Sequence, residues 1–208
     1  MLQRVLPTAL VACLLAAPLV AQAPAGLKIR IDRSTSATDP DNSPDLKVVT
    51  AGKGFRATGG PAGVFWMPTN MATGNYTVKA TFTLMKPSNH TNYYGLVFGG
   101  SNLDAATQAY GYFMVAQNGQ FMVKQRNGEQ TSTVQAATAN AAVKTPDVGG
   151  MSMNTLELRV AGDTITYVVN GQTVHTMPKG NVKTDGLVGV RVNHVLDVQV
   201  EGFELAKK

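Results

Sequence analysis

The segment "NTLELRVAGDTITYVVNGQTVHTM" (residues 154–177) constrains the fold more than any other part of this sequence. Apolar and polar residues alternate on both sides of Gly162-Asp163, which predicts an antiparallel hairpin with one buried face. A second turn at Asn170-Gly171 is predicted to pair His175 with Thr166 on the solvated face. The residues predicted to share the buried face are Leu156, Leu158, Val160, Ile165, Tyr167 and Val169.

The same pattern continues along most of the chain. Short apolar runs between residues 27 and 205 are separated by Gly-Gly, Asn-Gly and Pro-containing turns. Many short strands without alternating helices predict an all-β fold of two stacked antiparallel sheets, a sandwich. The Ala-rich segment 133–143 lacks an apolar stripe and is predicted to be a loop. Residues 26–208 have the size of one domain with its own core.

The first 25 residues are typical of a signal peptide. Arg4 precedes an apolar run, Val5–Val20, and Ala23-Pro24-Ala25 has the form of a cleavage site. We therefore expect an exported protein, periplasmic or extracellular. The alternative is lipidation at Cys13, because Leu10–Cys13 resembles a bacterial lipobox, and the protein would then be lipid-anchored.

The rest of the composition excludes several classes of protein. After the signal, no apolar run approaches the ~20 residues of a transmembrane helix. Cys13 is the single cysteine of the chain, so a disulfide scaffold is excluded. The formal net charge is +5, and the basic residues are scattered along the chain. Proteins that bind nucleic acid concentrate lysine and arginine on one face, so we expect no nucleic-acid partner.

The segment "AYGYFMVAQNGQFMVKQRNGEQ" (residues 109–130) predicts a second hairpin, and both of its faces carry apolar residues. A two-residue turn at Asn118-Gly119 would place Tyr110, Tyr112 and Met114 on one face. The opposite face would then carry Phe113, Val115, Met122, Lys124 and Arg126. Since a half-solvated sheet has one polar side, this second face is predicted to contact something other than water.

Together these segments resemble the concanavalin A-like lectin/glucanase family, whose laminin-G-like jelly rolls are also two-sheet sandwiches. The resemblance is carried by the segment above, by "DGLVGVRVNHVLDVQVEGFEL", and by the central segments beginning "NYTVKATFTL" and "AYGYFMVAQ". It covers residues 76–205. It implies an all-β antiparallel jelly roll in which one sheet is bent and its concave side holds a glycan or polysaccharide.

The resemblance also suggests where the glycan would lie. Phe113, Lys124 and Arg126 would line the groove floor, because aromatic rings cover the apolar faces of sugars and cationic groups donate to hydroxyls. The preceding loop would supply the rim. Its residues are Asn89, His90, Asn92, Tyr93 and Tyr94. The alternative is that Phe113 and Met122 are covered by a loop.

The predicted function is a non-catalytic, lectin-like carbohydrate-binding module. Retaining glycosidases of this fold carry an E-x-D-x-x-E motif, which the sequence lacks, and Asp197 and Glu201 are predicted to face solvent. A lyase would need Tyr, His and Arg together, and the predicted register separates Tyr112 from Arg126. Two alternatives remain: a hydrolase resembling the 3-keto-disaccharide hydrolases, and a cell-envelope protein-interaction module.

One metal site is predicted. In "DPDNSPD" the residues Asp39, Asp41 and Asp45 stand at alternating positions, an oxygen-rich spacing that suits a structural calcium ion. The segment departs from the EF-hand pattern, since Pro44 occupies the position of its glycine. The alternative is a solvated loop in which Asp and Asn side chains form turns.

Overall fold

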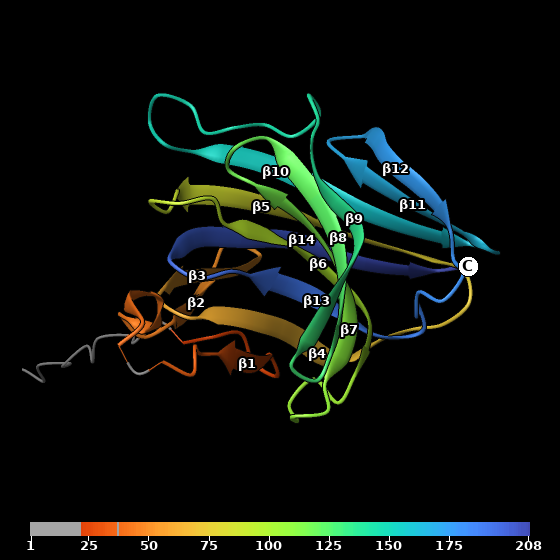
Figure 1. Cartoon of the computed structure of the whole chain (residues 1–208), viewed down its shortest axis with the longest axis horizontal. Coiled ribbons are helices and arrows are strands. Elements are labelled where there is room, and N and C mark those ends of the chain that lie inside the picture. Colours follow the sequence, from red (N-terminus) through yellow and green to blue (C-terminus); the bar gives the residue numbers. More distant parts are fainter. Residues whose placement is uncertain (1–21, 37) are drawn as a thin grey trace, which may run out of the picture.

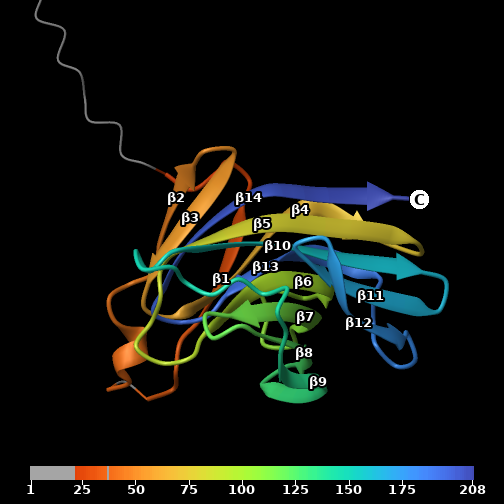
Figure 2. The same ribbon diagram turned by 90° about the horizontal axis from the view of Figure 1, so that it is seen from above.

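The computed structural model describes residues 22–36 and 38–208, which form two stacked antiparallel sheets (Figures 1 and 2). The predicted all-β sandwich is therefore confirmed. The expected signal peptide, with Cys13, lies almost entirely outside the described residues. One short 3-10 helix, η1 (Pro40–Asn42), occurs in the described part of the chain. The described residues include no helix long and apolar enough to cross a bilayer.

Sheet A has seven strands, each hydrogen-bonded to the next in spatial order. They are β1 (Lys28–Asp32), β4 (Ala62–Ala72), β13 (Gly186–Val192), β6 (Tyr93–Ser101), β7 (Ala109–Ala116), β8 (Gln120–Asn127) and β9 (Gln130–Ala139). The Ala-rich segment predicted to be a loop is largely strand β9, at the edge of this sheet. Its side chains are mostly exposed, which explains why its sequence shows no alternation of apolar residues.

Sheet B also has seven strands, again in spatial order. They are β12 (Gln172–Pro178), β11 (Thr164–Val169), β10 (Ser152–Ala161), β5 (Tyr76–Lys86), β14 (Leu196–Lys207), β3 (Gly54–Gly59) and β2 (Lys47–Ala51). In Figure 2 this layer lies above sheet A. The main core fills the space between the layers, with Phe82, Phe113, Tyr167 and Leu156 among its largest buried side chains.

The β10–β11 hairpin follows the predicted register. Leu158 pairs with Tyr167 and Val160 with Ile165, and the predicted buried face is in the core. The next hairpin departs from its prediction because a bulge between Tyr167 and Val168 shifts the pairing. His175 consequently pairs with Tyr167 instead of Thr166, and the two rings stack with centroids 5.7 Å apart.

The β7–β8 hairpin is shifted by one residue from its predicted register, and this shift changes the interpretation of the whole face. Val115 pairs with Phe121 and Phe113 with Val123, which leaves a three-residue loop, 117–119. Gly119 has a φ of +83° at the end of that loop, the conformation expected of a three-residue hairpin loop. Because side chains alternate between faces, the slip regroups the two predicted faces: Met122, Lys124 and Arg126 share a face with Tyr110, Tyr112 and Met114 and not with Phe113.

Candidate functional site: the outer face of sheet A

The outer face of sheet A carries a second apolar cluster that is separate from the main core. Tyr110, Tyr112 and Met114 on β7 lie here together with Met122 on β8, whereas Phe113 points into the main core. The prediction that Phe113 lines the groove is therefore wrong, since Phe113 packs edge-on against Tyr167 in sheet B. Trp66, Val64, Val97 and Leu103 complete this cluster.

Sheet A is strongly curved, with its outer face concave. β1 and β8 are five strand positions apart, which would separate them by about 24 Å in a flat sheet. Yet Arg126 on β8 reaches within 3.6 Å of the carboxylate of Asp32 on β1. The extended side chains cannot cover that separation alone, so the sheet bends and brings its edges toward each other.

A charged network occupies one end of this concave face. Asp32 accepts hydrogen bonds from Arg191 at 2.6 Å and from Arg30 at 2.8 Å, and Arg126 is its third cationic neighbour. Arg191 also donates to the hydroxyl of Tyr110. Burial alone would raise the pKa of Asp32, but the arginines, Arg191 foremost, hold it below its ordinary 3.8. Three guanidinium groups against one carboxylate leave a formal charge of +2.

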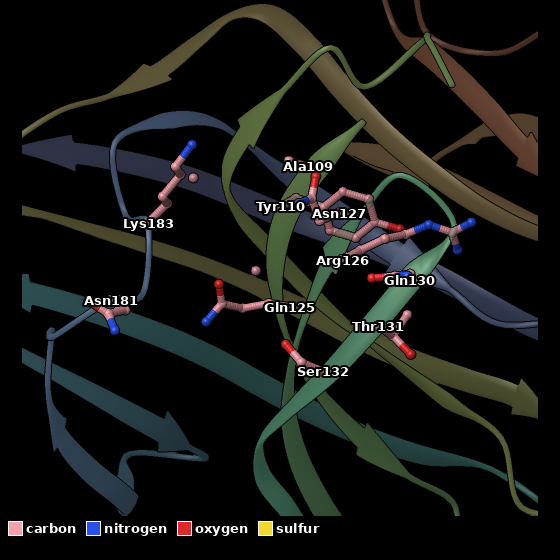
Figure 3. Close-up of a pocket in the computed structure, with 12 residues that line it drawn as sticks. Ala109, Tyr110, Gln125, Arg126, Asn127, Gln130, Thr131, Ser132, Asn181 and Lys183 are labelled. Atoms are coloured by element: carbon pink, nitrogen blue, oxygen red, sulfur yellow. The ribbon is translucent and has the colours of Figure 1, made fainter. Parts of the chain in front are cut away.

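The predicted site residue Arg126 therefore belongs to this network. Its Nε donates to the carbonyl oxygen of Gly128, and its Nη1 lies 3.6 Å from Oδ2 of Asp32. A polar hollow of about 360 Å³ lies at this end of the sheet (Figure 3). Figure 3 shows Gln125 pointing toward Asn181 and Lys183, whereas Arg126 extends in the opposite direction.

Next to this network, the concave face holds an open groove of about 500 Å³, and Arg191 donates to Asn193 in its lining. We refer to it as the outer groove. Lys124 and Met122 on β8 line it, and β9 supplies one wall through Thr133, Ala136 and Ala137. Its remaining lining residues come from the loop before β6, from the first residue of β6 and from the turn after β13, and these are His90, Thr91, Asn92, Tyr93, Asn193 and His194.

The outer groove thus brings together four of the predicted glycan-binding residues, His90, Asn92, Tyr93 and Lys124. Lys124 has no ion-pair partner among residues 22–36 and 38–208, so its ammonium group is available to a ligand. Tyr94 does not belong with them. It follows Tyr93 on the same strand, so its side chain points to the opposite face. There its ring packs on Phe82, and its hydroxyl accepts a hydrogen bond from the amide of Asn154.

The carboxylates of the predicted calcium site are separated. The side chain of Asp39 accepts from the backbone of Asp41 and caps η1, while Asp45 pairs with Arg33. Asp41 instead meets His90 and His194, with its Oδ2 3.8 Å and 3.1 Å from their Nε2 atoms. Sequence analysis missed His194, and its proximity to Asp41 has no signal in the sequence because the two residues are far apart along the chain.

The carboxylates of β14 lie on the outer face of sheet B. Asp197 forms a two-pronged ion pair with Arg56 and also accepts from Thr58. Glu201 accepts from the backbone nitrogen of Lys53. Both residues therefore face away from the core, as predicted, and they are on the opposite sheet from the outer groove.

No protein-family model matches the sequence, and no curated protein matches it. Solved structures do match. A carbohydrate-binding module, CBM66, from Bacillus subtilis superposes with a TM-score of 0.62 at 13% identity, covering 78% of this chain and 92% of that one. The fold is concanavalin A-like.

Two further structures extend this likeness. The exoplasmic/lumenal domain of VIP36, solved with Ca²⁺ and Man3GlcNAc, matches with a TM-score of 0.59 at 10% identity, covering 86% of this chain and 83% of that one. Alginate lyase A1-II′ matches with a TM-score of 0.50 at 16% identity, covering 77% and 83%. The concanavalin A-like fold is thus shared by binding proteins and by enzymes, so the likeness establishes the fold alone.

Proposed function

We propose that this protein is an exported, non-catalytic carbohydrate-binding module that holds a saccharide in the outer groove. The observation that carries the proposal is the groove itself, about 500 Å³ of open space on the concave face of a concanavalin A-like sandwich. That volume is in the range of small-ligand sites. Solved structures of this fold include a carbohydrate-binding module and a protein with bound Man3GlcNAc, which supports the same assignment.

The lining chemistry suits a sugar. The ring of Tyr93 can cover an apolar sugar face, while the amide nitrogen of Asn193 can donate to a hydroxyl. The ammonium group of Lys124 and the +2 network beyond it make the concave face basic. A saccharide that carries carboxylate or sulfate groups therefore fits this face better than a neutral one.

The test is a glycan-array screen of the purified protein, followed by calorimetric titration of the strongest-binding oligosaccharide. Tyr93→Ala should weaken binding by roughly tenfold, the effect of losing one stacking ring. Tyr94→Phe is the matched control, because the neighbouring tyrosine points into the core and its change should leave affinity intact. Absence of any bound glycan would contradict the proposal, and binding of neutral glycans alone would contradict its acidic part.

A polysaccharide lyase is the second candidate. Tyr112 and Arg126 lie on the same face, contrary to the predicted register, and the Arg191 guanidinium lies 5.9 Å from the Tyr112 ring centre. However, burial raises the pKa values of Tyr110 and Tyr112, and both side chains are almost inaccessible. Such hydroxyls are poorly suited to abstracting a proton. Release of an unsaturated, ultraviolet-absorbing sugar from an acidic polysaccharide would reverse this ranking.

A further inference from the structure

Three metal-ligating side chains converge at the rim of the outer groove. The Nε2 atoms of His90 and His194 are 3.3 Å apart, and both lie near Oδ2 of Asp41, at 3.8 Å and 3.1 Å. Tetrahedral ligands at 2.0–2.2 Å from a zinc ion are separated by about 3.3–3.6 Å. The three observed separations bracket that range, so one cation can contact all three atoms after small side-chain movements.

The cluster is assembled from three separate loops, each fixed by hydrogen bonds. Asp41 lies in η1, which is capped by the side chain of Asp39. The loop carrying His90 is held by reciprocal bonds between Ser88 and the amide of Gln117 on the adjoining hairpin. These contacts make the convergence a property of the packed fold, since no member depends on a free chain end.

The turn that presents His194 is also strained. Val195 has a φ of +57°, a left-handed conformation that is unfavourable for a β-branched residue. Its backbone nitrogen donates to Gly60, and the backbone nitrogen of Asn193 donates to Tyr93, so His194 is held from both sides. Strain of this kind persists where the surroundings require a particular geometry, and it concentrates at functional sites.

Hydrogen bonds join this cluster only in part. An imidazole N–H can connect Nε2 of His194 with Oδ2 of Asp41 at 3.1 Å, but the 3.8 Å between Nε2 of His90 and the same oxygen is too long for a hydrogen bond. The amide nitrogen of Asn92 also lies 3.1 Å from Nε2 of His90 and can donate to it. A cation would compete with that amide for the lone pair on Nε2 of His90. It would also accept a lone pair from each of the other two ligand atoms of the cluster.

We propose that Asp41, His90 and His194 bind a divalent transition-metal ion of the zinc type. Two imidazole nitrogens and one carboxylate oxygen are the ligands such ions prefer, whereas calcium selects oxygen alone. Three protein ligands leave a fourth tetrahedral position open. Because both histidines line the outer groove, that position is accessible from the groove, where a hydroxyl or carboxylate oxygen of a ligand can occupy it.

The test uses the purified protein, expressed without a polyhistidine tag and measured without any saccharide, so its result is independent of the proposed function. Zinc binding is followed by calorimetry, and Co²⁺ serves as a probe whose visible absorption reports tetrahedral coordination. The parent should bind one zinc ion per chain and melt at a higher temperature with zinc. His90→Gln and His194→Gln should each weaken binding by at least about 10–100-fold, since even indirect partners of metal ligands have effects of that size.

His175→Gln is the matched control. It removes the one histidine of the chain that is outside the cluster. His175 stacks on Tyr167, and the variant should bind zinc as the parent does. If His194→Gln fails to fold, His90→Gln decides the matter, because its side chain is half exposed. The proposal is overturned if the parent binds no zinc, or if His90→Gln and His175→Gln bind zinc equally well.

Discussion

The two sheets contribute their inner faces to the same core, but their outer faces are built differently. The outer face of sheet B carries many Thr, Lys, Glu and Arg side chains. Among them is the partly exposed ion pair of Arg56 with Asp197. The outer face of sheet A holds buried aromatic rings and a carboxylate surrounded by three arginines. A face that only meets water needs none of this burial, and this difference supports the proposal that sheet A contacts the ligand.

The largest effect should come from removing the buried carboxylate of sheet A. Asp32→Ala leaves the guanidinium of Arg191 buried without its partner, so we expect a loss of about 3–5 kcal/mol in the free energy of unfolding. Asp197→Ala breaks the equivalent pair on sheet B, where Arg56 is 40% exposed, and should cost about 1 kcal/mol or less. Urea denaturation of both variants measures the difference. Equal losses of unfolding free energy would contradict the distinction between the two sheets.

Phe113→Ala should cost nearly as much, about 3–5 kcal/mol, because it leaves a cavity between the sheets. Its effect on glycan affinity should be negligible in the folded protein, since the ring points away from the outer groove. Thermal melts and glycan titrations of this variant separate the two effects. Weakened binding with unchanged stability would mean that the sequence-predicted register was correct.

Lowering the pH should also distinguish the carboxylate of sheet A from that of sheet B, with a smaller change in the free energy of unfolding. The folded pKa of Asp32 lies below 3.8, so its stabilising contribution is complete above the unfolded-state value and is lost as the pH falls through the folded value. The unfolding free energy of the parent should therefore decline between about pH 5 and pH 2. Asp32→Asn should flatten this decline more than Asp197→Asn does, and an identical slope in both variants would contradict the account.

The sequence predicted the sandwich and the β10–β11 register because Gly162-Asp163 forms a two-residue turn, and the apolar alternation is then unambiguous. The same reasoning failed by one residue at Asn118-Gly119. That dipeptide also fits a three-residue loop, and both faces of the hairpin are apolar, so burial did not reveal the error.

The site was predictable only in part. The family resemblance placed Asn92 and Tyr93 on the loop before a central strand and Lys124 on the neighbouring hairpin, and these three residues do line the outer groove. The meeting of Asp41 with His194 depends on how three loops pack at one end of the sandwich. Periodicity does not specify such packing, because these loops are irregular and lie far apart in the chain.

The central claim, that sheet A carries the binding face and sheet B does not, is tested most directly by two lysines. Lys124 lines the outer groove, and Lys79 stands on the outer face of sheet B. The glycan selected by the array is titrated against Lys124→Ala and Lys79→Ala under the same conditions. We predict that Lys124→Ala loses affinity by roughly 10–100-fold while Lys79→Ala matches the parent. Equal affinities, or a loss at Lys79 alone, would contradict it.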